Sequence, residues 1–234
     1  QLRVEKFSQH ERFAEFNKKT VDLIIGEARN LALKEILPTQ VIGDRQGVHF
    51  ENGVVTVPEE FKKVYETYRE GEWVAMTESI DWGGQGMPRT VALAASEYFI
   101  GANLAFMMYP GLTHGAGRLI ETFGTAKQKE LFVKKLYTGQ WCGTMLLTEP
   151  EAGSDPVSQQ TTAVKDGDHY IINGAKTFIT NGVHADLYFV AAKTGEAGRN
   201  RQITMFAVEK GTPGFSFGKK EDKMGIRCVP VVGL

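Results

Sequence analysis

Cysteine is scarce in this sequence, and blocks of like charge are missing. Cys142 and Cys228 are the two thiols in 234 residues, and neither has a histidine nearby at metal-ligand spacing. A disulfide framework and a metal site are therefore not expected, and the thiols fit a reducing compartment as ordinary buried side chains. The 27 basic and 28 acidic residues are interspersed. This balance argues against nucleic acid or an anionic membrane surface as the main partner.

Long apolar runs, internal repeats and low-complexity tracts are also missing. The most apolar stretch, residues 91–109, contains Glu97 and Asn103, which fits a buried helix better than a membrane span. Gly115-Ala116-Gly117 has no third glycine at the required spacing and follows no strand, so it is not a dinucleotide-binding fingerprint. With 42% apolar residues, the chain is expected to be globular.

Helical periodicity dominates the chain up to about residue 140. Apolar residues recur with helical spacing over residues 11–37, and Pro38 should end this amphipathic helix. Residues 43–53 are expected to form a turn-rich loop or small hairpin. Pro58, followed by two glutamates, predicts a helix that ends at Gly71. Further predicted elements are a long apolar, central helix over 90–108, a helix over 112–123, and a last helix opened by a capping box at Thr125 and Gln128.

After Gly139, short runs of β-forming residues alternate with turns. Asp166-Gly167 and Asn173-Gly174 suit hairpin turns because both pairs tolerate positive φ. Strands are expected over 144–147, 160–164, 169–172, 177–180, 186–191 and 203–208. The predicted fold is α+β, with an all-helical bundle domain over residues 1–140 and a small antiparallel β-barrel or sandwich domain over residues 141–234.

Two segments of the second part stand out chemically. Residues 147–155 read LTEPEAGSD: a strand end, a hydroxyl, and a turn of small residues where backbone N–H groups can converge on an anion such as a pyrophosphate. Residues 173–181 read NGAKTFITN and add an aromatic ring and a second hydroxyl. A flavin needs a flat apolar wall against its ring and donors along its edge. Together the two segments indicate a flavin site.

In these segments, and more weakly from about Glu59 to Leu234, the sequence resembles the acyl-CoA dehydrogenase family. Supporting segments are residues 82–86 (WGGQG), 123–129 (FGTAKQK) and 223–227 (KMGIR). Residues 43–53 resemble the longer subgroup of the family, which includes methylthiopropanoyl-CoA dehydrogenases. The resemblance implies an N-terminal helical domain and a middle β-domain. A further helical domain follows in the family, so a fragment is expected that lacks this C-terminal domain and ends within a strand.

The resemblance implies FAD as the cofactor and assigns its contacts. The cofactor-binding residues would be Met145, Leu147, Thr148, Gly153, Ser154, Phe178 and Thr180. Thr148 would lie near the pyrimidine edge, Phe178 behind the ring and Thr180 near N5. The family commonly has tryptophan where this chain has Phe178, so altered tuning of the flavin is expected. Residues expected to contact the substrate are Ser154, Met108, Tyr109 and Leu112.

Each of these residues also has a structural explanation when taken singly. The threonines could be β-formers on a sheet, Phe178 a core aromatic, and Gly153-Ser154 an ordinary turn. Core packing explains Met108, Tyr109 and Leu112 nearly as well as an acyl pocket does. The joint occurrence of the two motifs in the right order favours the flavin site.

No catalytic residue is expected in this chain. Dehydrogenation of an acyl thioester requires a base that removes the α-proton, and placement of that base is essential. In the family the base is a glutamate of the C-terminal domain, so the chain alone should not turn over. Glu149 and Glu151 lie beside the flavin motif, but Glu149 precedes Pro150 in a turn, and neither is assigned this role. His114 and Arg227 are interpreted as structural, with contacts to an acyl or CoA channel as the alternative.

The expected function is FAD-dependent α,β-dehydrogenation of an acyl-CoA to the 2,3-enoyl-CoA, as in fatty acid β-oxidation, with hydride transfer to flavin N5. The resemblance implies an electron-transfer flavoprotein as partner and a homodimer or homotetramer for the full-length protein. It implies a location in the cytoplasm of a bacterium or in the mitochondrial matrix of a eukaryote. Two alternatives stay open: a same-fold acyl-CoA oxidase or flavin monooxygenase, and a non-catalytic acyl-CoA- or protein-binding module.

Overall fold

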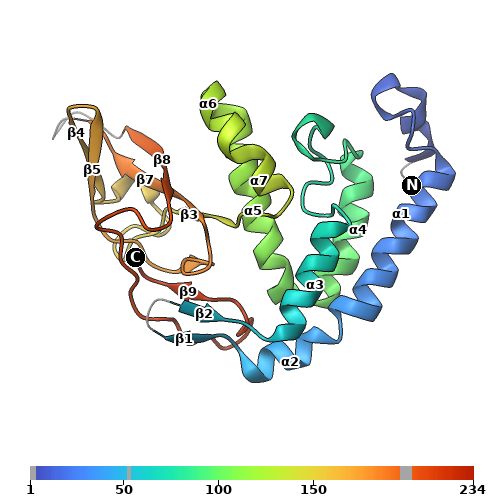
Figure 1. Ribbon diagram of the computed structural model, residues 1–234, viewed down its shortest axis with the longest axis horizontal. Helices are drawn as coiled ribbons and strands as arrows, with labels where there is room; N and C mark the ends of the chain where they lie inside the picture. The colour runs from blue at the N-terminus through green and yellow to red at the C-terminus, as the bar shows by residue number, and fades with distance from the viewer. Residues whose placement is uncertain (1–3, 52–53, 196–201) are drawn as a thin grey trace.

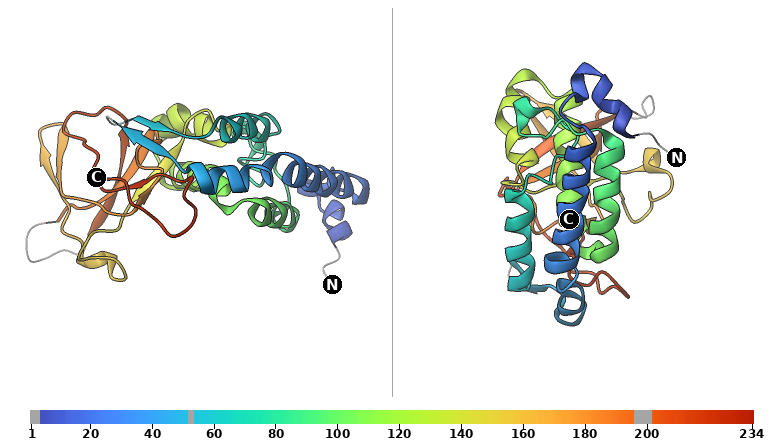
Figure 2. Two further views of the ribbon diagram at one scale, coloured as in Figure 1. Left: turned by 90° about the horizontal axis from the view of Figure 1, so that it is seen from below. Right: turned by 90° about the vertical axis from the view of Figure 1, so that its right-hand side faces the viewer.

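Helices and strands occupy opposite ends of an elongated molecule (Figures 1 and 2). The computed structural model describes residues 4–51, 54–195 and 202–234. Figure 1 shows α5 between the sheet and α4, with α1 at the far edge of the helical part. The helices are α1 (Lys18–Leu31), α2 (Thr39–Gln46), α3 (Glu59–Glu70), α4 (Arg89–Ala102), α5 (Leu104–Phe123), α6 (Ala126–Gln128) and α7 (Lys134–Tyr137).

The strands form one larger sheet and two small ones. They are β1 (His49–Glu51), β2 (Val54–Thr56), β3 (Gly143–Leu146), β4 (Thr162–Asp166), β5 (His169–Asn173), β6 (Ile179–Thr180), β7 (Leu187–Lys193), β8 (Ile203–Glu209) and β9 (Val231–Val232). The larger sheet has the order β3-β7-β4-β5, with β8 also paired to β7. Hairpin β1-β2 and the pair β6-β9 are separate.

The predicted α+β class, a helical part followed by a β part, is confirmed. The larger sheet, however, is mixed where antiparallel strands were expected, because β7 pairs in parallel with β3 and with the start of β4. The long connection between β3 and β7 brings the chain back to the same end of the sheet, and such a return permits parallel pairing. Among the described residues the strands do not close into a barrel.

Several local predictions are confirmed because short-range signals decide them. α3 begins directly after Pro58 and ends at Gly71. Thr125 and Gln128 form a reciprocal capping box at the start of α6. Gly167 has a φ of 57° in the turn between the antiparallel strands β4 and β5.

The prediction of one helix over residues 90–108 is wrong. Asn103 interrupts it with extended backbone angles, and its side-chain oxygen accepts a hydrogen bond from the Phe106 N–H at the start of α5. The predicted helix over 112–123 is the continuation of α5. The first segment is not buried on all sides, since Leu93 is 60% exposed and Ile100 is 48% exposed.

Residues 11–47 also differ from expectation. The predicted single helix divides into a short 3-10 turn (Glu11–Phe13), α1, and a π-helical turn over Ala32–Ile36. Helix α2 then follows Pro38 where a loop was predicted. Gly43 is needed for close packing, because a Cβ at this position would lie 2.6 Å from the Phe61 ring. The predicted turn at Asn52-Gly53 lies outside the described residues.

Asn173-Gly174 is not a hairpin turn. β5 ends at Asn173, and the next strand, β6, pairs with β9. Gly174 passes so close to Thr161 that a Cβ would collide with its side chain and backbone. The glycine therefore serves a close approach and not a positive φ.

The end of the described chain returns to the helical core. Cys228, Val229 and Val231 are buried among side chains of α3, α4 and α5. The Tyr109 hydroxyl on α5 donates a 2.6 Å hydrogen bond to the Cys228 carbonyl. On the other side of α5, Ala116 and Ile120 pack with residues of β7. No helix within the described ranges is long and apolar enough to cross a membrane.

Candidate functional site

The two sequence motifs lie side by side and are joined by hydrogen bonds. The Thr177 N–H donates to the Thr148 carbonyl at 2.9 Å, and the Thr144 hydroxyl of β3 donates to the Thr180 carbonyl of β6 at 2.6 Å. The buried Lys176 ammonium donates to the Leu147 carbonyl at 3.1 Å. Segments about thirty residues apart thus form one hydrogen-bonded surface, in line with the sequence prediction that the two motifs build one site.

Large apolar side chains are displayed on this surface. Met145 is 44% exposed, Leu147 is 40% exposed and Phe178 is 63% exposed. Alternate residues of a strand point to the same side, so Met145 and Leu147 face outward together while Thr144 and Leu146 are buried. Phe178 has a φ of 56°, a left-handed conformation that a bulky residue rarely adopts. We refer to Met145, Leu147 and Phe178 as the apolar face.

Polar groups border the apolar face. The side chains of Thr148 and Thr180 are half-buried, whereas Gly153 and Ser154 are exposed. A Cβ at Gly153 would meet no atom within 4 Å. Within the described residues, the N–H groups of Gly153 and Ser154 make no hydrogen bond. Such unpaired N–H groups in an open turn can bind an anion.

A buried ion pair joins the first motif to the second. Lys176 and Glu149 are each 3% exposed, and the Lys176 Nζ lies 2.8 Å from Glu149 Oε1. Burial alone would raise the pKa of Glu149, but hydrogen bonds from the Gln160 N–H, Lys176 and Thr161 lower this pKa to about 2. A carboxylate with a lowered pKa that already accepts several hydrogen bonds is a poor proton acceptor. Glu149 therefore holds the loop and is unsuited to act as a base, in agreement with the sequence interpretation.

Of the residues expected to contact substrate, Met108, Tyr109 and Leu112 lie on α5 and differ in accessibility, whereas Ser154 lies in the exposed turn of the first motif. The Met108 carbonyl accepts a 3.1 Å hydrogen bond from the Asn181 amide, which places this turn of α5 directly beside the end of the second motif. Leu112 is half-buried. Tyr109 is 6% exposed, and its hydroxyl is engaged by the Cys228 carbonyl, so the ring contributes mainly packing.

These residues fit a flavin on two grounds. An exposed apolar face bordered by hydroxyls and by free N–H groups matches the flat ring, polar edge and pyrophosphate of FAD. The backbone strain at Phe178 projects a ring into solvent, where it packs against little within the described chain. Strain of this kind persists where a functional geometry requires it. Met145, Leu147, Thr148, Gly153, Ser154, Phe178 and Thr180 are the residues that could hold the cofactor.

Sequence reasoning missed three buried polar residues at this site. Lys176 belongs to the second motif, but a lone lysine in a strand context normally indicates solvent exposure. Gln159 accepts a 2.7 Å hydrogen bond from Lys176, and Asn181 has a φ of 59°. The asparagine that ends the motif could have indicated a left-handed residue, because asparagine tolerates that conformation.

Other candidate residues have structural partners. Arg227 forms an exposed ion pair with Asp44, with a 2.9 Å distance from Nη1 to Oδ1. His114 contacts the buried Glu78 carboxylate at 2.8 Å through Nε2. Both thiols are buried and free, and burial raises the pKa of Cys142 to about 12. Cys142 is therefore not a reactive nucleophile.

Comparison with known proteins identifies two adjoining family matches. The model for the N-terminal domain of acyl-CoA dehydrogenases matches residues 19–140, and the model for the middle domain matches residues 144–234. A 3-methylmercaptopropionyl-CoA dehydrogenase from Ruegeria pomeroyi is 37% identical over 212 residues, covering 83% of this chain and 36% of that relative. A broad-specificity linear acyl-CoA dehydrogenase from Mycobacterium tuberculosis is 34% identical over 250 residues, covering 97% of this chain and 40% of that relative.

Solved structures agree with these matches. Butyryl-CoA dehydrogenase from Megasphaera elsdenii superimposes with a TM-score of 0.79 at 32% identity, covering 91% of this chain and 54% of that one. A glutaryl-coenzyme A dehydrogenase bound to glutaryl-CoA superimposes with a TM-score of 0.82 at 26% identity, covering 92% of this chain and 53% of that one. The chain thus spans about half the length of these structures.

Proposed function

Because the chain belongs to the acyl-CoA dehydrogenase family, we propose that it is the part of such an enzyme that places FAD against the acyl group of a CoA thioester. The observation that carries this proposal is the apolar face, formed where the two motifs are hydrogen-bonded together. The bound flavin would supply the hydride-accepting chemistry. Phe178 and Leu147 would pack on the ring, and Thr148 and Thr180 would hydrogen-bond at its edges.

The reaction that we propose is α,β-dehydrogenation of an acyl-CoA to the 2,3-enoyl-CoA. Met108 and Leu112 would border the acyl group, since the Asn181–Met108 bond places this turn of α5 beside the second motif. Ser154 would contact the cofactor or the thioester side of the substrate. The engaged Glu149 leaves the base to be supplied from elsewhere in the longer protein. An electron-transfer flavoprotein as acceptor, a homo-oligomeric assembly and a cytoplasmic or mitochondrial-matrix location belong to the same proposal.

We also propose that the chain divides near residue 140 into a helical and a β-domain. The two family matches lie on either side of this position, which supports the division.

Binding of FAD tests the cofactor assignment directly. Quenching of FAD fluorescence on titration with the chain should be saturable, and Phe178→Ala should weaken binding by roughly tenfold or more, given the apolar ring area lost. Phe123→Ala is the matched control, because Phe123 is 81% exposed, ends α5 and belongs to neither motif. Equal affinities for the two variants would contradict the placement of the flavin.

The reaction itself is tested with the full-length protein. Anaerobic addition of acyl-CoAs of graded length should bleach the flavin absorption band at about 450 nm. Reoxidation by an electron-transfer flavoprotein but not by oxygen would favour the dehydrogenase over an oxidase or monooxygenase. A flavin that no acyl-CoA bleaches would contradict the proposed reaction.

A further inference from the structure

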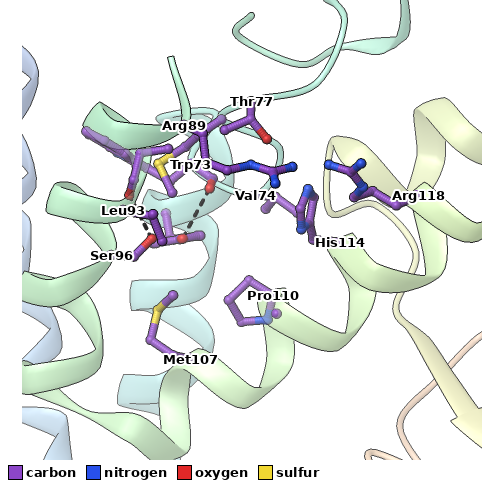
Figure 3. A pocket seen from close by; sticks show the side chains of 14 residues that line it. Trp73, Val74, Thr77, Arg89, Leu93, Ser96, Met107, Pro110, His114 and Arg118 are labelled. Carbon is purple, nitrogen blue, oxygen red and sulfur yellow. Dashed lines mark hydrogen bonds between the residues drawn. The ribbon is translucent and has the colours of Figure 1, made fainter. Parts of the chain in front are cut away.

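Helix α5 lines a different cavity on each of two faces. Figure 3 shows the larger one, between α4 and α5, with Arg89 and Arg118 among its lining residues. The other cavity has a volume of about 330 Å³, within the range typical of small-molecule sites. It lies between α3, α5 and the segment that leads into β7, and neither Met108 nor Leu112 lines it. This second cavity is therefore not part of the proposed acyl site.

Aromatic rings make up much of the wall of this second cavity. Phe61 and Tyr65 come from α3, and Phe106 and Tyr109 come from α5. The Phe61 ring is inclined at 63° to that of Phe106 and at 67° to that of Tyr109, with centroids 6.2 Å and 6.5 Å apart, respectively. Rings at such angles form a corner that presents both ring edges and ring faces. The negative face of an aromatic ring attracts an organic cation.

A carboxylate without a counter-ion also lines the cavity. Asp186 is half-buried, and one of its oxygens accepts a 2.8 Å hydrogen bond from the Cys142 N–H, but no cation pairs with it within the described part of the chain. The Lys210 ammonium is nearby but donates to the Val183 carbonyl at 3.1 Å. Burial lowers the pKa of His184, so its imidazole is uncharged at neutral pH and does not neutralise Asp186.

The other charged side chains of the wall are already paired. The Lys62 Nζ lies 3.2 Å from Glu59 Oε2, and the Arg69 Nη2 lies 2.6 Å from Glu66 Oε2. Since each of these pairs is neutral as a whole, the cavity retains the negative charge of Asp186. An anion would be repelled there, whereas a cation would find both a carboxylate and aromatic rings.

We propose that this cavity binds a small organic cation, an amine or quaternary ammonium compound, with its charge beside Asp186 and its alkyl groups against the rings of Phe61, Phe106 and Tyr109. The rings remove alkyl surface from water, and the carboxylate compensates a charge that burial would otherwise destabilise. Neither the flavin nor the proposed reaction is needed for this binding. The site adds a ligand at the junction of the helical and β parts.

Choline is the probe, and its carbon analogue dimethylbutanol, in which a tert-butyl group replaces the trimethylammonium group, is the uncharged counterpart. Isothermal titration of the 234-residue chain should give saturable choline binding with a stoichiometry of about one, and markedly weaker binding of dimethylbutanol. Asp186→Asn keeps an oxygen for the Cys142 N–H and should weaken choline binding by about tenfold or more without affecting dimethylbutanol. Asp168→Asn, in the exposed turn between β4 and β5, is the matched control and should bind choline normally.

A second variant changes the charge at the cavity without altering its buried wall. The Lys62 side chain is 52% exposed on α3, so Lys62→Gln should leave the fold intact. It should strengthen choline binding by about two- to threefold, because a like charge is removed and Glu59 is freed. Lys63→Gln, at the next position of α3 and outside the cavity wall, is its control.

The titrations of the unmodified chain and of Lys62→Gln remain decisive even if Asp186→Asn does not fold. Absence of saturable choline binding would overturn the proposal, as would equal binding of choline and dimethylbutanol. Unchanged choline affinity in folded Asp186→Asn or in Lys62→Gln would overturn it as well.

Discussion

Phe178 shows how a single residue can be unfavourable for the fold and useful at a surface. Its left-handed backbone costs free energy, and its ring is mostly exposed, so little packing offsets that cost. Lys176 and Glu149 illustrate the opposite case, in which two buried charges pair with each other and form further hydrogen bonds with Leu147, Gln159, Gln160 and Thr161. Both arrangements occur within the two motifs that form the candidate flavin site.

Replacing Phe178 with glycine should separate stability from cofactor binding. Glycine adopts positive φ without a Cβ clash, so Phe178→Gly should raise the unfolding free energy by about 1 kcal/mol. The same change removes the ring and should weaken FAD binding by tenfold or more. Urea unfolding and FAD titration measure the two effects. A loss of stability together with unchanged FAD affinity would show that the ring serves packing.

The Glu149 carboxylate should make the stability depend on acid pH. Its pKa is about 2 in the folded protein against an ordinary value of 4.5, so its contribution is complete above pH 4.5 and is lost as the pH falls toward 2. This contribution is on the order of 3 kcal/mol. Urea unfolding between pH 5 and pH 2.5 should show a steep decline that is absent in the double variant Glu149→Gln with Lys176→Met.

The double variant is used because Glu149→Gln alone leaves the Lys176 ammonium buried without a counter-charge. That single change should cost about 3–5 kcal/mol at pH 7. Glu151→Gln is the control, since Glu151 is exposed and two residues away. The same steep acid dependence in the double variant would show that other carboxylates cause it.

At the scale of elements, the break between α4 and α5 decides where the candidate site residues lie. Asn103 ends one helix, caps the next, and donates through Nδ2 to the buried Thr39 hydroxyl at 2.9 Å. A continuous helix would carry Met108 and Leu112 in a different direction. The cap therefore positions the turn of α5 that meets the second motif.

Asn103→Ala should destabilise the protein more than the loss of an ordinary cap. Substitution of a capping asparagine costs about 0.5–2 kcal/mol. At Asn103 the hydroxyl of buried Thr39 also loses a donor, so we expect about 2 kcal/mol or more in urea unfolding. Asn17→Ala removes the exposed cap of α1 and is the matched control, with an expected cost of about 1 kcal/mol. Equal losses in both variants would mean that the buried contact adds nothing.

Elements were predictable where neighbouring residues alone determine them. Pro58 and Gly71 bound α3, and Asp166-Gly167 turns a hairpin, because each acts within one turn of chain. The role of Asn103, the helix after Pro38 and the close approach at Gly174 depend on contacts with distant residues, which periodicity does not contain. The two site motifs could be recognised from order and chemistry. The burial of Lys176 could not, because its partners come from other segments.

For the whole molecule, the helical and β parts should unfold together. The Tyr109–Cys228 hydrogen bond and the burial of Val229 and Val231 join the last described segment to the helical core. Thermal unfolding followed by far-ultraviolet circular dichroism and by tryptophan fluorescence should therefore give one coincident transition. Tyr109→Phe should lower its midpoint, with a cost of about 1–2 kcal/mol from the unpaired carbonyl, without splitting it. Two separate transitions in the unmodified chain would contradict this coupling.

The pairing of β6 with β9 has a consequence for biosynthesis. β6 carries Thr180, which lies opposite Val231 of β9, and the ribosome adds Val231 only after β7 and β8 have been made. During translation the helices can pack first, but β6, which carries one edge of the apolar face, has no paired strand until the chain has grown past Val232. The surface that we assign to FAD can therefore form only late in translation. A nascent chain stalled before Val232 should carry no bound cofactor.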